Sequence, residues 1–292
     1  MKRKIWRFLA VLLSTTMCLS LVACGDEVVI TEDNTQNAQV TEVTEQQEPA
    51  SEVQEEDGSW AVYWYLCGSD LETNGGFATT DLDEMLQVDL PENVNVVIQT
   101  GGAAVWQNEY MDPAKIQRWL YNSEGLQLLE EQDTANMGEA QTLYEFLAFA
   151  NENYPADKVA VTFWNHGGGS VNGAAFDEIY GYDSLDLSEM YQAFDAVWPA
   201  DTDNPSLELV GFDTCLMATI DVAAVFQNFA KYLVASEEVE PGNGWYYTGW
   251  LGALADNSGM NGEDLGIAIC NSYYEGCEAV GTQDQTTLSV TN

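Results

Sequence analysis

The sequence predicts an α/β fold with a mostly parallel sheet flanked by helices on both faces. Along residues 59–292, apolar runs of strand length alternate with segments of helical spacing, which is typical of βαβ units. Two of these runs, 159–164 and 207–212, are almost continuously hydrophobic. Strands buried on both faces of a parallel sheet have this composition.

The expected elements follow the chain in order. The predicted strands are 60–67, 94–101, 159–164, 207–212, 232–236 and 286–290. The predicted helices are 75–88, 138–154, 216–229 and 264–276. Helix 138–154 carries apolar residues at helical spacing, and helix 75–88 has acidic residues in its first turns. Residues 105–121 alternate around Asp112-Pro113 and predict a hairpin at the sheet edge.

Two of the predicted strands end at reactive residues. The segment KVAVTFWNHGGG, 158–169, ends in His166 and three glycines, and LELVGFDTC, 207–215, ends in Cys215. Ligands bind outside the carboxyl ends of the strands in open α/β sheets. We therefore expect an imidazole and a thiol to lie together at that edge.

His166 is the only histidine of the chain. A lone histidine before glycines is more often a structural residue than a catalytic one. The strand-terminal Cys215 reverses that preference, because a thiol needs a proton-transfer partner for acyl chemistry. Glycines after the histidine allow the backbone to approach a substrate carbonyl, and a free amide there can donate to an oxyanion.

These motifs resemble the clostripain family of cysteine peptidases, which belongs to the caspase-like clan. The specific part of the resemblance is WNHGGG followed by FDTCLM, and the segments WAVYWYLCGSDLE, DLDEM and SEEVEPGNGW match in the same order. The resemblance extends from about Trp60 to the end of the sequence. It implies a caspase-like peptidase domain over residues 59–292. Because members of the family usually continue further, it also implies a chain shortened at its C-terminus.

The resemblance implies a role for each residue of the site. Cys215 is the expected nucleophile, His166 protonates the leaving amine, and the amides of Gly167 and Cys215 form the oxyanion hole. Asp213 is the expected S1 residue for an Arg or Lys side chain, although a structural cap of the following helix is the alternative. The EPGNGW loop is expected to form a second S1 wall through Asn243, where related sequences often carry Asp.

The expected function is a membrane-anchored extracellular cysteine endopeptidase with a Cys/His dyad that cleaves after Arg or Lys. Its partner is a peptide or protein substrate with a basic P1 residue. The alternative is a catalytically inactive clostripain-like lipoprotein that acts as a binding protein, since fold does not determine function. An esterase or transpeptidase that uses the same dyad also stays open.

Many relatives mature by cutting themselves after a basic residue between the catalytic histidine and cysteine. This chain has no Lys or Arg from Val159 to Ala230. We therefore predict that it acts as a single chain, or is cut elsewhere, for example near Lys231.

The N-terminal residues predict export and attachment to a membrane. Residues 1–23 contain a basic start and a short apolar stretch, which are typical of a signal peptide. The sequence LVAC resembles a lipobox and predicts lipidation of Cys24, with an ordinary signal peptide as the alternative. Residues 24–58 are expected to form a disordered acidic tether, with 11 acidic and no basic residues in 25–58. The expected location is extracytoplasmic, on a bacterial cell membrane.

The charge balance excludes one class of partner. Four of the eight basic residues lie in 1–23, so the rest of the chain has four basic and 48 acidic residues, a formal charge of −44. Phosphates would be repelled, and nucleic-acid binding is not expected. A negative field would attract cationic peptides, although acidity also serves solubility alone.

No cofactor is required for thiol–imidazole chemistry, and a zinc site is not expected from one histidine and no CxxC pair. The acidic residues near the first predicted helix offer a calcium alternative, since carboxylates suit that ion. They are Asp70, Glu72, Asp81, Asp83 and Glu84. Acidic residues at a helix start are also favourable without metal. Cys67 is expected in a buried strand, and Cys270 and Cys277 on one helix, too far apart for a disulfide.

Overall fold

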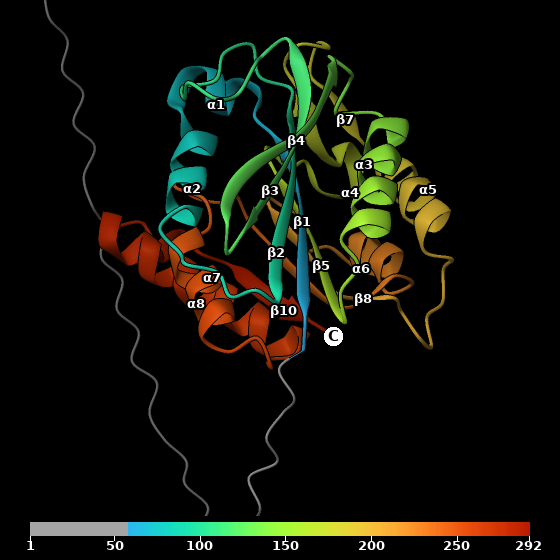
Figure 1. The fold of residues 1–292 in the computed structure, drawn as a ribbon. Helices are drawn as coiled ribbons and strands as arrows, with labels where there is room; N and C mark the ends of the chain where they lie inside the picture. The colour runs from blue at the N-terminus through green and yellow to red at the C-terminus, as the bar shows by residue number, and fades with distance from the viewer. Residues whose placement is uncertain (1–57) are drawn as a thin grey trace, which may run out of the picture. The chain divides into compact units, whose positions relative to one another are not determined.

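The computed structural model describes residues 58–292 (Figure 1). The predicted signal peptide 1–23, the lipidation site Cys24 and the tether up to residue 57 lie outside the described residues, and they stay predictions. In the described part, no helix is both long and apolar enough to cross a membrane.

An eight-stranded sheet forms the centre of the domain, in the order β10-β9-β8-β5-β1-β2-β3-β4. Five strands are mutually parallel: β1 (Trp60–Cys67), β2 (Val94–Gly101), β5 (Lys158–Trp164), β8 (Leu207–Asp213) and β9 (Ala230–Ser236). Antiparallel strands extend both edges: β3 (Lys115–Asn122), β4 (Gly125–Asp133) and β10 (Leu288–Thr291). The mostly parallel sheet confirms the predicted fold class.

Helices cover both faces of this sheet (Figure 1). On one face, α3 (Ala140–Asn153), α5 (Leu187–Val197) and α6 (Ile220–Phe226) contribute to one hydrophobic core. On the other, α2 (Phe77–Met85), α7 (Tyr247–Asp256) and α8 (Gly262–Val280) contribute to a second core. The shorter elements are α1 (Ser69–Gly75), α4 (Gly169–Asn172), the β6 (Ala174–Asp177) and β7 (Asp183–Leu185) pair, and η1 (Gln283–Gln285).

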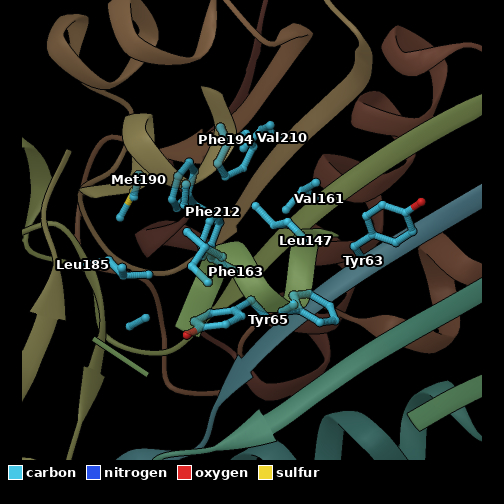
Figure 2. Packing of buried hydrophobic residues seen from close by; sticks show 14 of the residues in the cluster. Tyr63, Tyr65, Leu147, Val161, Phe163, Leu185, Met190, Phe194, Val210 and Phe212 are labelled. Carbon is cyan, nitrogen blue, oxygen red and sulfur yellow. The ribbon is translucent and has the colours of Figure 1, made fainter. Parts of the chain in front are cut away.

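Aromatic side chains form a row across β1, β5 and β8, close to the carboxyl ends of these strands (Figure 2). Tyr65 of β1 is paired in register with Phe163 of β5, and Phe163 with Phe212 of β8. The rings of Phe163 and Phe212 stack with centroids 4.9 Å apart, and Tyr65 meets Phe163 edge-on at 5.9 Å. Each such pair contributes about 1 kcal/mol beyond its buried area.

The predicted hairpin at 105–121 is wrong in position. The hairpin at this edge of the central sheet is β3–β4, and its turn follows Asn122, whose side-chain oxygen accepts from the amide of Glu124. Asp112 instead caps a local turn before β3, because its Oδ1 accepts from the amide of Ala114. An Asp-Pro pair marks a turn, but not which strands the turn connects.

Helix boundaries also differ from the predictions. The helix expected at 75–88 is limited to α2, Phe77–Met85, which follows Gly76 with a φ of +65°. The helix expected at 216–229 is limited to α6. Helices α1, α4, α5 and α7 were not predicted, although α5 begins with a capping box formed by Asp186 and Glu189.

The cysteine predictions are confirmed. The four cysteines in the described residues are free, and Cys67 is buried in β1. Cys270 and Cys277 both lie on α8.

Candidate active site

The register of the central strands brings the predicted catalytic residues together. Trp164 of β5 is paired with Asp213 of β8, and the same register continued by two residues sets His166 opposite Cys215. On the other side of β5, Leu66 of β1 is paired with Trp164, so the loop after β1 approaches His166.

A pocket of about 230 Å³ lies at these strand ends. It is lined by Leu71, Phe77, Trp164, Asn165, His166, Asp213, Thr214, Cys215, Val239, Glu240, Pro241, Gly242 and Gly244. The structure therefore brings His166, Cys215 and Asp213 to one cavity, together with the loop that follows β9. A larger groove of about 720 Å³ lies elsewhere, between α6 and β9, and contains none of these three residues.

Hydrogen bonds hold the histidine loop in place. The buried side chain of Asn165 donates to the carbonyl of Cys67 at 2.8 Å and accepts from the amide of Phe176 at 2.7 Å. The next residue, His166, presents Nε2 to Oδ1 of Asp70 at 2.9 Å. Its ring meets the ring of Phe176 edge-on, with centroids 6.3 Å apart. The imidazole therefore has a defined orientation.

The cysteine loop packs closely against the histidine loop at Gly167. A Cβ at this position would lie 2.0 Å from the carbonyl oxygen of Cys215, so only glycine fits. After the cysteine, Leu216 has a φ of +66°, a left-handed conformation that is uncommon for leucine. The Sγ of Cys215 accepts from the amide of Glu240 at 3.3 Å. Within residues 58–292, no direct hydrogen bond joins Cys215 to His166.

The amides of Gly167 and Cys215 are available for an oxyanion. Within the described chain, neither N–H donates to a protein acceptor, whereas the amide of Leu216 donates to the carbonyl of Glu238 at 3.1 Å. Two free amides beside a thiol are the donors that a tetrahedral intermediate requires.

Asp213 lies buried at the floor of the pocket, with 4 % of its surface exposed. Its carboxylate accepts from the amide of Trp245 at 3.2 Å and from the hydroxyl of Tyr247 at 3.0 Å. Asp81, from α2, is also buried and accepts from Nε1 of Trp164 at 2.6 Å. A Cβ at Gly244 would be within 3.5 Å of both carboxylates, so these two acids converge on one point.

Glu240 is a pocket residue that sequence analysis did not single out. Its Oε1 is buried and has no hydrogen-bond partner within residues 58–292. The preceding acids Glu237 and Glu238 are exposed instead. The acidic stretch before Pro241 indicated that an acid could lie at the pocket. It did not indicate which one, because the path of the loop determines which side chain points into the pocket.

The buried acids favour their protonated forms. Burial raises the pKa of Asp213 to about 7, and burial with the nearby charge of Asp213 raises the pKa values of Asp81 and Glu240. An unfolded aspartate has a pKa near 4, so the folded domain holds this proton more tightly. The contribution of Asp213 to stability is therefore present below about pH 4 and is lost as the pH rises to about 7.

Asn243 does not line the pocket, which corrects its predicted place in an S1 wall. Its amide nitrogen donates to Sγ of Cys277 at 3.4 Å, and its oxygen accepts from the hydroxyl of Thr282 at 3.3 Å. The side chain is held toward the end of α8, and Glu240 supplies the acidic group of this loop.

The acidic residues proposed as a calcium alternative have separate partners. Asp70 contacts His166, and Asp81 accepts from Trp164. Glu72 accepts from the amides of Thr79 and Gln107, and Glu84 accepts from the amide of Tyr247. Among residues 58–292, no group of three or more His, Cys, Asp or Glu could hold a metal ion. Calcium dependence stays an untested prediction.

Comparisons with known proteins give consistent matches. The sequence model of the clostripain family, Peptidase_C11, matches residues 64–292. Clostripain from Hathewaya histolytica is 31 % identical over 142 residues, which cover 44 % of this chain and 27 % of that protein. The chain therefore spans about a quarter of the length of this relative.

Two solved structures share the fold. The first is a secreted C11 cysteine protease from Bacteroides thetaiotaomicron in complex with an irreversible peptide inhibitor. It has a TM-score of 0.60 and 22 % identity, over 80 % of this chain and 65 % of that one. The second is an inactive zymogen C11 protease from Parabacteroides distasonis. It has a TM-score of 0.59 and 18 % identity, over 80 % of this chain and 61 % of that one.

The buried acids predict an unusual effect of Asp213→Asn on stability. At pH 8 the substitution removes a buried charge close to two other acids, and we expect a gain on the order of 2 kcal/mol, or about 5 °C in Tm. At pH 5, where Asp213 is protonated, the gain should disappear. Thermal unfolding at the two pH values measures this difference, with the exposed Asp89→Asn as matched control. Equal destabilisation at both pH values would contradict it.

Proposed function

Because this chain belongs to the clostripain family, we propose that it is a cysteine endopeptidase that cleaves after Arg or Lys, with Cys215 as nucleophile and His166 as acid–base. The observation that carries the proposal is the shared pocket at the ends of β5 and β8. It combines a thiol, an imidazole and a buried carboxylate, and next to it Gly167, which packs against Cys215, has an amide that is unoccupied like that of Cys215.

In the proposed reaction, the Sγ–H proton passes to His166 and the thiolate attacks the scissile carbonyl carbon. The π electrons of the carbonyl move to its oxygen, and the amides of Gly167 and Cys215 donate to that oxyanion. The intermediate collapses as the C–N bond breaks, and His166 gives its proton to the leaving amine. Water then adds to the thioester with His166 as base, which releases the acid and restores the thiol.

A basic P1 side chain suits the acids at the floor of the pocket. A bound cation would give the unpartnered Oε1 of Glu240 a partner and offset the repulsion between Glu240 and Asp213. A carboxylate must be ionised to bind a cation strongly. Burial raises the pKa of Asp213 to about 7, so selectivity for basic over neutral P1 residues should increase as the pH rises through 7.

The proposal includes an extracytoplasmic location, with lipid on Cys24 holding the chain at a membrane. It is supported by sequence alone: a basic start, a short apolar stretch and LVAC. The described residues do not bear on this part.

The function is tested with fluorogenic peptides that carry Arg, Lys, Ala or Asp at P1. We expect turnover after Arg and Lys to be at least tenfold faster than after Ala or Asp, and at least a thousandfold loss in Cys215→Ala, because no other group supplies the nucleophile. Asp213→Asn should lower kcat/KM for basic P1 substrates by at least tenfold and leave neutral substrates unaffected.

Two results would contradict these expectations. Turnover that is fastest after a neutral or acidic P1 residue would support the Cys/His dyad and contradict the assignment of Asp213 to the S1 pocket. No turnover by the folded chain would favour the inactive binding protein.

Placement of the basic residues predicts resistance to self-cleavage. Beyond residue 23 the chain has four of them, and all lie in strands: Lys115, Arg118, Lys158 and Lys231. Each has a partner: Lys115 pairs with Asp133 at 3.1 Å, Arg118 with Glu130 at 2.7 Å, and Lys231 with Glu208. Lys158 donates to the carbonyl of Met260 at 2.6 Å. A strand paired in a sheet cannot extend into a protease cleft without local unfolding.

We therefore expect the purified enzyme to keep residues 58–292 in one piece during prolonged incubation. Intact-mass spectrometry over a day measures this, with Cys215→Ala as the control. Fragments that end anywhere within 58–292, including 167–214, and that are absent from the control would show cleavage by the enzyme itself and refute the prediction.

A further inference from the structure

We propose that Asp70 is a positioning residue for the reaction, because its carboxylate holds the imidazole of His166 in the tautomer that leaves Nδ1 free to take the proton of Cys215. This inference rests on the proposed function. It adds a third member to the expected pair of His166 and Cys215.

The contact is direct. Oδ1 of Asp70 lies 2.9 Å from Nε2 of His166, and the side chains are 32 % and 39 % exposed. An exposed ion pair on a protein surface contributes little to stability. This pair differs from an ordinary surface pair in its location, because its histidine lines the pocket that contains Cys215. Its value would therefore appear in catalysis and not in folding.

The local backbone presents Asp70 to the histidine. Asp70 lies in the first turn of α1, directly after β1, whose end approaches the end of β5. Ser69, which precedes it, is buried with a φ of +51°, and its hydroxyl donates to the same Oδ1 at 3.2 Å. Uncommon backbone conformations of this kind persist where the surroundings hold them in place.

The other side of the ring is also supported. Phe176 meets the imidazole edge-on, and its amide is held by the side chain of Asn165. Ala175, which precedes Phe176, has a φ of +62°. Helix α1, the loop after β5 and strand β6 thus combine to set one orientation of the ring.

The carboxylate selects one tautomer. A neutral imidazole carries a single N–H, and an ionised carboxylate can only accept, so Nε2 bears the proton beside Asp70. Nδ1 is then unprotonated and can accept the thiol proton. When the ring becomes an imidazolium, the negative charge of Asp70 stabilises it. An asparagine can turn its amide group to Nε2 as a donor and favour the wrong tautomer.

The sole histidine of the chain makes the tautomer measurable without assignment. The full chain, ¹⁵N-labelled at histidine and purified without a histidine tag, gives one pair of ring nitrogen signals at pH 8. We expect a protonated Nε2 and an unprotonated Nδ1 in the wild type. Asp70→Asn should shift the signals toward the opposite or an averaged state, while Asp89→Asn, at an exposed site, should leave them unchanged.

Kinetics give the second readout. On a peptide with Lys at P1, we expect Asp70→Asn to lower kcat about tenfold with KM unchanged, because proton transfer and not binding is affected. Asp70→Glu keeps an acceptor and should recover part of the loss. In thermal unfolding, the Tm values of Asp70→Asn and Asp70→Glu should differ from that of the wild type by no more than the Tm of the control Asp89→Asn does.

Several outcomes would overturn the inference. They are a wild-type ring protonated at Nδ1, an Asp70→Asn tautomer like that of the wild type, or a kcat equal to that of Asp89→Asn. The wild-type spectrum alone shows whether the ring is protonated at Nδ1, even if a variant fails to fold. If no peptide is turned over, the proposed function fails, and the tautomer still tests Asp70 separately.

Discussion

The register of β1, β5 and β8 is the constraint on which the candidate site depends. Side chains alternate between the faces of a sheet, so a slip by one residue would move Asp213 to the opposite core and set His166 opposite Thr214. The stacked rings of Phe163 and Phe212 resist such a slip, because they can pair only when these two residues are aligned. Packing in the core thus determines which groups meet at the sheet edge.

On the opposite face of the sheet, buried acids lie near the ends of the same strands. Asp213, Asp81 and Glu240 lie close together with raised pKa values, and burial is the main cause. Hydrophobic residues would make a more stable floor. Under the proposed specificity for basic P1 residues, the substrate would supply the missing countercharge, which gives the pocket a reason to retain these acids. The proposal therefore implies that these acids have better partners in the substrate complex than in the free domain.

Sequence patterns were sufficient to predict the central strands and the strand ends that carry His166 and Cys215. Buried parallel strands leave a strong signal, and both residues follow directly from strand ends. Side chains in loops were less predictable. Asn243 turns to Cys277 and Thr282 on and beyond α8, and no local pattern encodes that distant contact. The direction of the Glu240 side chain was also unpredictable, because it depends on the path of the loop in the folded domain. The hairpin was misplaced because Asp112 forms a local turn whose role depends on tertiary pairing.

The central claim is that Cys215 is the nucleophile beside an acidic S1 pocket. Covalent labelling tests it most directly, with peptide chloromethyl ketones that carry either Lys or its uncharged analogue norleucine at P1. Peptide mapping by mass spectrometry locates the adduct and gives its rate. The account predicts one adduct, on Cys215, that forms at least tenfold faster with Lys. Equal rates for the two reagents, or labelling confined to Cys67, Cys270 or Cys277, would contradict it.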